Sequence, residues 1–171
     1  EMIGRLGVGH VGGSLSIVEL LTVLYYSKAK VDPAHPDAPD RDRVVLSKGH
    51  AGPALYSVLA DKGYFPMSKI RTLNQPGTDL PSHCDMNKTT GVDMTAVSLG
   101  QGLSCAAGMA LARKIDKKDY HVEALIGDGA SKEGQICAAM IYACTYGLDP
   151  PPTSLHHTHQ DGHRPHHNAP S

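Results

Sequence analysis

Two short apolar runs, each ending in a glycine-containing turn, are the clearest feature of the hydrophobic pattern. Residues 122–126 are followed directly by Gly127-Asp128-Gly129, and residues 44–46 are followed by S-K-G-H. Apolar runs of this length without strict alternation are typical of strands that are buried on both faces of a parallel sheet. We therefore predict two parallel strands whose carboxyl ends lie at the same edge of a sheet, where open α/β folds bind their ligands.

Segments with helical spacing of apolar residues alternate with these strands. The pattern predicts helices over residues 17–24, 53–62, 105–113 and 134–146. Ser16 and Glu19 form a capping-box pattern for the first of them, and Pro53 suits the first turn of the second. The order strand, helix, strand, helix predicts an α/β fold with a parallel sheet flanked by helices.

Three connections are irregular, and each could carry function or simply join elements. The first, G-V-G-H-V-G-G-S-L-S, is a glycine-rich loop around His10, and a proline-rich surface connection covers residues 31–43. The third, residues 74–98, contains P-S-H-C-D with His83, and His50 lies at the predicted strand-to-helix turn. An isolated loop histidine is commonly just solvated, so these histidines are site candidates only in combination.

The composition changes abruptly at residue 150. Six of the 11 histidines lie in P-P-P-T-S-L-H-H-T-H-Q-D-G-H-R-P-H-H-N-A-P-S, which has almost no apolar residues. Such a segment cannot offset the entropy of folding, so we predict a domain over residues 1–149 and a disordered tail over residues 150–171. We interpret the tail as out of frame or derived from cloning; adventitious binding of Zn²⁺ or Ni²⁺ is the alternative.

Composition and charge exclude several classes of function. The 171 residues suffice for one domain, and the formal net charge of -1, without a basic stripe, argues against nucleic acid. No apolar stretch has the length of a membrane span and no signal core follows a basic start, so we expect a cytoplasmic protein without membrane contact. The four cysteines lack C-x-x-C spacing, and we expect buried free thiols.

Asp128 is the candidate with the most specific chemistry. A carboxylate is a hard oxygen ligand suited to Mg²⁺ or Ca²⁺, and the flanking glycines allow the backbone to approach a ligand closely. A diphosphate held through a metal would suit this arrangement, although Asp-Gly is also a common turn dipeptide.

Four motifs together resemble the transketolase family. They are G-H-V-G-G-S-L-S, R-D-R-V-V-L-S-K-G-H, S-L-G-Q-G-L-S-C-A-A-G-M-A and G-D-G-A-S-K-E-G-Q, in the family's order and spacing. Over residues 1 to about 149 the chain resembles the N-terminal, thiamine-diphosphate-binding part, and most of all the N-terminal subunit of a split bacterial or archaeal transketolase. The resemblance implies a diphosphate-binding domain of the thiamine-diphosphate fold that is truncated at both ends and incomplete at the C-terminus.

The resemblance also assigns roles to residues. Asp128 would bind Mg²⁺, and Glu133 matches a glutamate at the family's dimer interface, next to the cofactor. The histidines that would line the channel to the reactive ring and handle substrate protons are His10, His50 and His83. The residues that would contact thiamine diphosphate are Leu99, Gly100, Gln101, Gly127, Asp128, Gly129 and Glu133.

The implied reaction transfers a two-carbon ketol unit from a ketose phosphate to an aldose phosphate. The catalytic glutamate would come from a partner, either a C-terminal transketolase subunit or a second protomer, so we expect the isolated chain to be inactive. Thr158 stands where the family has a metal-binding Asn, and Val97 replaces a glycine. The alternative is therefore a non-catalytic, truncated fragment with an incomplete metal site.

Overall fold

The sheet of this protein is parallel, as the apolar runs predict. The computed structural model describes residues 1–148 and 153–156, and within them strands β1 (Arg43–Leu46), β2 (Val122–Gly127) and β3 (Thr153–His156) pair in the order β1-β2-β3. Arg43 lies opposite Val122 in the first pair, and Ala124 lies opposite Thr153 in the second. The predicted pairing of residues 44–46 with residues 122–126 is confirmed, and both strands end at the same edge.

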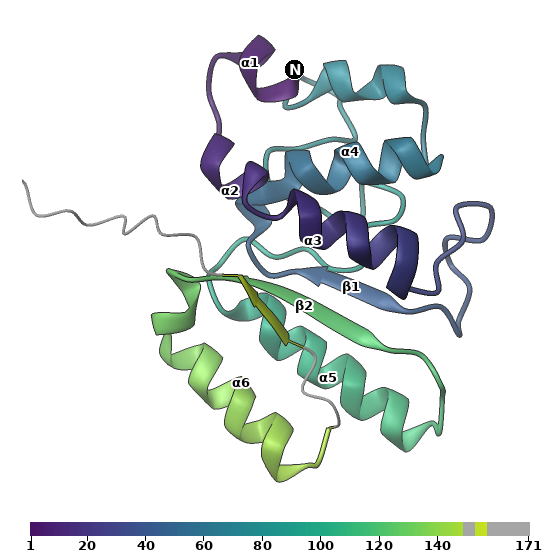
Figure 1. Ribbon diagram of the computed structural model, residues 1–171, viewed down its shortest axis with the longest axis vertical. Helices are drawn as coiled ribbons and strands as arrows, with labels where there is room; N and C mark the ends of the chain where they lie inside the picture. The colour runs from purple at the N-terminus through teal and green to yellow at the C-terminus, as the bar shows by residue number, and fades with distance from the viewer. Residues whose placement is uncertain (149–152, 157–171) are drawn as a thin grey trace, which may run out of the picture.

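Helices cover both faces of the sheet (Figure 1). On one face lie α1 (Met2–Leu6), α2 (Val11–Leu15), α3 (Val18–Val23) and α4 (Gly52–Lys62), and on the other lie α5 (Gln101–Ile115) and α6 (Gly134–Thr145). A π-helical turn, η1 (Leu24–Lys28), extends α3, and the 3₁₀ segments are η2 (Gly49–Ala51), η3 (Met67–Thr72) and η4 (Ala130–Lys132). The predicted α/β class with flanking helices is confirmed.

The alternation of side chains along the strands divides the core into two layers. Val44, Leu46 and Leu125 belong to the cluster beneath α3 and α4, whereas Val45 and Ile126 belong to the cluster beneath α5 and α6. Because successive side chains of a strand point to opposite faces, one apolar run supplies both layers. This is why the runs are apolar without interruption.

Small residues let α5 lie close to the sheet. Its buried positions include Gly102, Ala106 and Ala110. A Cβ built on Gly102 would lie 2.7 Å from the Cα of Ser47, so the helix touches the backbone that leaves β1. The start of α5 is thereby fixed beside the carboxyl end of β1.

Two buried carboxylates fix the start of the sheet. Asp42 accepts hydrogen bonds from the backbone N–H groups of Lys30 and His121, both at 2.6 Å. Asp93 accepts one from the N–H of Val44 at 2.6 Å and pairs with the guanidinium of Arg41. Asp93 therefore anchors the long segment 74–98, which is irregular as predicted, to β1.

The N-terminal segment differs from prediction in two respects. Residues 11–15 of the glycine-rich loop form the short helix α2, and His10 is its N-cap. The predicted capping box is wrong: the N-cap of α3 is Ile17, without a side-chain cap. The hydroxyl of Ser16 instead donates to the carbonyl of Gly13 at 3.2 Å and accepts from Lys48 Nζ at 3.0 Å.

The C-terminal tail is not without structure throughout. Residues 153–156 form β3, so the prediction of disorder is wrong for them. Backbone groups along the edge of β2 can pair with an added strand whatever its side chains, and hydrophobic patterning does not report this pairing. The rest of the predicted tail lies outside the described residues.

The cysteines are free, as expected, but not all are buried. Cys84 is buried and Cys105 is partly buried, whereas Cys137 and Cys144 are exposed on α6. These two lie on the helix face that points away from Ile136, Ala139 and Ala143, which pack on the sheet.

In the part of the chain that is described, no helix combines the length and the apolar character that crossing a membrane requires.

Candidate functional site

A cleft of about 460 Å³ opens at the carboxyl edge of the sheet. Its walls come from the turns that follow β1 and β2, from α2 with the residues before it, and from the segment before α5. The lining residues are Gly9, His10, Val11, Gly12, Gly13, Lys48, His50, Leu99, Gly127, Asp128, Gly129 and Ala130. His50 and Asp128 share this one crevice, as the sequence predicts.

The three predicted histidines gather at one end of this cleft. The ring centroids of His10 and His50 are 5.1 Å apart, and those of His10 and His83 are 6.0 Å apart. His83 comes from the irregular segment 74–98 and does not itself line the cleft. The fold therefore gathers imidazoles from three distant parts of the sequence around His10, and two of them line the cleft.

The surroundings of His50 keep its imidazole neutral. Burial lowers the pKa of His50 to about 4, and the electrostatic effects of His10, Lys48 and His83 act in the same direction. A neutral imidazole carries one N–H donor and one acceptor nitrogen. At neutral pH, His50 can therefore both donate a hydrogen bond to a ligand and accept one from it.

Lys48 is the functional candidate that our sequence reasoning missed. Its side chain is only 1% exposed, and its ammonium donates to Ser16 Oγ at 3.0 Å within the wall of the cleft. Burial lowers the pKa of Lys48, and the carboxylate of Asp128 partly counteracts this shift. The available signal was a lysine placed directly after a buried strand, in S-K-G-H, because a buried cation needs an anionic counterpart.

Asp128 lines the cleft, one residue beyond the end of β2. Its flanking glycines leave space: a Cβ on Gly129 would meet nothing within 4 Å, and one on Gly127 would only reach the aliphatic part of Lys48, at 3.9 Å. The cleft thus places one carboxylate and one buried ammonium close enough to interact. This pair offers one group to a cation and one to an anion.

Gly13 is needed for the histidine end of the cleft. A Cβ at this position would lie 2.7 Å from Cδ2 and 3.0 Å from Nε2 of His50. Any side chain on residue 13 would therefore push the imidazole from its place. The second glycine of the pair in G-H-V-G-G thus serves close packing against His50.

Several predicted cofactor residues do not line the cleft. Leu99 does, but Gly100 is buried with φ of 83° and packs against Gln135, while Gln101 is exposed at the start of α5. Glu133 is the exposed N-cap of α6. Gly100, Gln101 and Glu133 therefore have no place in the cleft as it stands in this single chain.

Val97 is not strained. Among the described non-glycine residues, positive φ angles occur only at Asn74 and Lys117, and in the S-L-G-Q-G segment the positive φ belongs to Gly100. Val97 is 61% exposed. The valine that stands in place of the family's glycine therefore meets no positive-φ requirement at this position.

The described residues hold no group of three or more His, Cys, Asp or Glu side chains that could bind a metal ion. Asp128 is the carboxylate that lines the cleft. Thr158, which stands where the resemblance calls for a metal-binding Asn, lies outside the described residues. A metal here would need most of its oxygen ligands from a bound ligand and from water.

Comparison with known proteins agrees with this geometry. Residues 1–150 match the family described as "Transketolase, thiamine diphosphate binding domain". The chain is 60% identical over 149 residues to the 6-deoxy-6-sulfo-D-fructose transketolase subunit SqwG of Clostridium sp. (strain MSTE9), covering 87% of this chain and 54% of the relative. It is 40% identical to an apulose-4-phosphate transketolase subunit of Phocaeicola vulgatus, covering 87% of this chain and 53% of that relative.

Solved structures show the same fold. The transketolase of Campylobacter jejuni superposes with a TM-score of 0.81 at 31% identity, covering 86% of this chain and 24% of that one. The enzyme of Leishmania mexicana gives 0.74 at 28% identity, over 84% of this chain and 24% of that one. This chain thus spans about half the length of the curated subunits that it matches, and about a quarter of the full-length enzymes.

Proposed function

The chain belongs to the transketolase family, in its thiamine diphosphate-binding domain, and from this premise we propose that it is the cofactor-holding part of a two-chain transketolase. In this proposal the cleft holds thiamine diphosphate with Mg²⁺. Together with a partner chain, the protein would transfer a two-carbon ketol unit from a ketose phosphate to an aldose phosphate. The buried Lys48 beside Asp128, in the same cleft as His10 and His50, is the observation that carries the proposal.

The residues of the cleft fit the cofactor chemically. A buried ammonium is costly unless an anion is near, and a diphosphate would supply that anion to Lys48. Asp128 would contribute one oxygen to Mg²⁺, which binds through one or two carboxylates together with phosphate and water oxygens. Gly127 and Gly129 leave the strand end open to a ligand of this size.

The histidines would manage protons on the sugar. When bound, the cofactor would supply an electron sink for cleaving and forming carbon–carbon bonds. His50, kept neutral by burial, could accept a proton from a substrate hydroxyl, while His10 and His83 would orient the hydroxyls by hydrogen bonds. These three residues would therefore act on the sugar, and Lys48 and Asp128 on the diphosphate and the metal.

A partner chain would complete the enzyme. Two relatives are named as transketolase subunits, and each is about twice as long as the part that this chain matches. The catalytic glutamate implied by the resemblance would come from that partner, and Glu133, exposed at the start of α6, would lie at the interface. The substrates would be sugar phosphates.

Calorimetry with thiamine diphosphate tests the proposal. We expect binding that requires Mg²⁺ and is abolished by Asp128→Ala, because the metal then loses its protein oxygen ligand. Lys48→Met should weaken binding about tenfold or more, since a charge-assisted contact to the diphosphate is lost. Asp119→Ala is the matched control: this carboxylate is exposed in the turn before β2, and its loss should leave affinity unchanged.

Two outcomes would contradict the proposal. One is the absence of Mg²⁺-dependent binding by the parent chain, which would favour the non-catalytic fragment. The other is binding that survives both substitutions in the cleft. Ketol transfer by the purified chain alone would instead disprove the need for a partner.

A further inference from the structure

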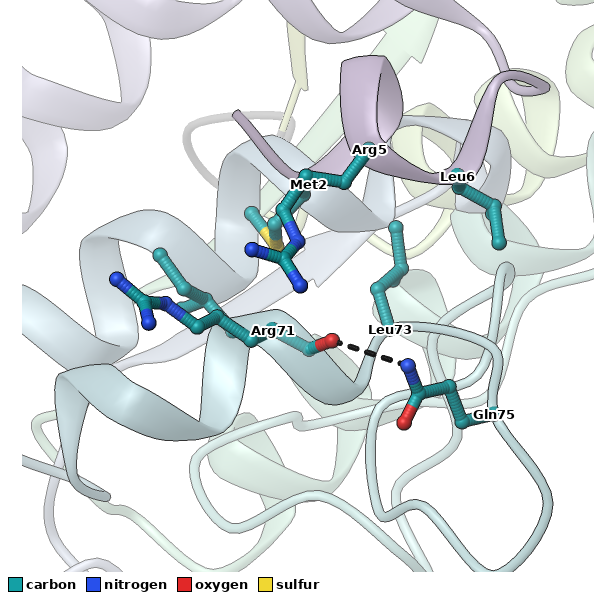
Figure 2. A pocket seen from close by; sticks show the side chains of 7 residues that line it. Met2, Arg5, Leu6, Arg71, Leu73 and Gln75 are labelled. Carbon is teal, nitrogen blue, oxygen red and sulfur yellow. Dashed lines mark hydrogen bonds between the residues drawn. The ribbon is translucent and has the colours of Figure 1, made fainter.

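A second, smaller pocket lies away from the cleft, between α1 and η3 (Figure 2). Its volume is about 90 Å³, and two arginines, Arg5 and Arg71, reach it from these separate elements. We propose that this pocket binds a single oxyanion group, such as phosphate, independently of the cofactor cleft.

The charge of the pocket supports an anionic ligand. The residues that line it carry two guanidinium groups and no carboxylate. Among the described residues, the side chain of Arg5 makes neither an ion pair nor a hydrogen bond, whereas the neighbouring cation Lys69 is already paired with Asp79. The positive charge at this pocket is therefore not balanced by its own walls.

Arg71 is held in place but remains available to a ligand. Its only ion pair among the described residues is with Glu1, at 3.7 Å between Nε and Oε1, and both side chains are more than half exposed. A pair this long and exposed contributes little, so an oxyanion can compete with Glu1 for the guanidinium. The carbonyl of Arg71 accepts a hydrogen bond from Gln75 Nε2 at 3.4 Å, which places an amide at the edge of the pocket (Figure 2).

Buried apolar side chains line the pocket together with the arginines. Met2 is 9% exposed and Leu73 is 5% exposed. Buried apolar neighbours reduce the screening of the guanidinium charges by water, and guanidinium groups match the oxygens of phosphate through paired N–H donors. The pocket is much smaller than the cleft of about 460 Å³, which suits one oxyanion group better than a whole nucleotide.

Site-resolved NMR tests this proposal. Inorganic phosphate is titrated at low and constant ionic strength, and the Nε–Hε signals of Arg5 and Arg71 are followed. We expect both signals to shift along one saturable curve, and Arg5→Gln to weaken binding at least about fivefold. Arg5→Lys should restore only part of the affinity, because the charge returns without the fork of donors.

Lys69→Gln is the matched control, since it removes one positive charge from η3, the element that carries Arg71, but not from the pocket. Equal weakening by Lys69→Gln and Arg5→Gln would overturn the proposal, because it would reveal only a general charge effect. The absence of saturable shifts in the parent would also overturn it. Arg5 is exposed, so Arg5→Gln should fold normally, and a thermal melt that matches the parent checks this.

Further arms of the titration separate sources of the oxyanion. If the natural ligand is a phosphorylated small molecule, methyl phosphate should bind about as tightly as inorganic phosphate. If methyl phosphate binds more weakly, the pocket is a site for the free phosphate ion. Acetate should bind more weakly than either, because it offers fewer oxygens. The phosphate affinity measured at Arg5 and Arg71 should be unchanged in Asp128→Ala, so this result tests the pocket separately from the cofactor cleft.

Discussion

Gly49→Ala should damage the protein severely, because the turn after β1 has no room for a side chain. A Cβ at this position would lie 1.8 Å from the backbone oxygen of Ala96 and 3.0 Å from its carbonyl carbon. Contacts below 3.0 Å are essentially never seen, so the two backbones must move apart by roughly 1 Å or more. Ala96 is fully buried, which prevents easy relief. We expect a loss of at least about 3 kcal/mol of stability.

Urea unfolding followed by circular dichroism measures this loss. With a slope of about 1–3 kcal/mol per M, the midpoint should fall by roughly 1–3 M. Gly108→Ala is the control: a Cβ there meets nothing within 4 Å, and alanine in the middle of α5 should stabilise by about 0.5–1 kcal/mol. If Gly49→Ala unfolds at the same urea concentration as the parent, the backbone contact between the turn and residue 96 is not as described.

Two further predictions concern buried charges. Asp93→Asn should destabilise the fold by about 3 kcal/mol in the same urea assay, since it leaves the guanidinium of Arg41 without its carboxylate partner. The pKa of His50 is lowered to about 4, so the folded state resists a proton that the unfolded state accepts, and stability should fall as the pH drops from about 6.5 to about 4. About 1–2 kcal/mol of this loss, after allowing for solvent screening, should be absent from His50→Gln. If the unfolding free energies of the parent and of His50→Gln depend on pH in the same way, the low pKa of His50 is refuted.

The sequence predicted the parts of the fold that follow from local pattern. A strand buried on both faces must be apolar throughout, so residues 44–46 and 122–126 stood out, and the glycine turns after them located the cleft. The proximity of His10, His50 and His83 could be predicted only from the family resemblance. These residues are 33 to 73 positions apart, and no local sequence rule predicts contacts over such separations. The structure places them side by side.

The errors have a common physical cause, which is that tertiary partners outweigh local preference. Ser16 is a residue type that often caps helices, but here its hydroxyl oxygen accepts a hydrogen bond from the buried ammonium of Lys48. Residues 153–156 lack the apolar pattern of a core strand, but the backbone of β2 provides their partners.

The electrostatics of the cleft favour a ligand that carries both signs of charge. Lys48 is buried, and Asp128 only partly compensates for the cost of its charge. An anion alone would satisfy Lys48 but repel Asp128, and a cation alone would do the reverse. A diphosphate that brings its own divalent cation satisfies both groups at once. Its negative charge would also oppose the effect of Lys48 on His50, so under the proposed function the bound anion would raise the pKa of His50 from the low value that burial mainly sets.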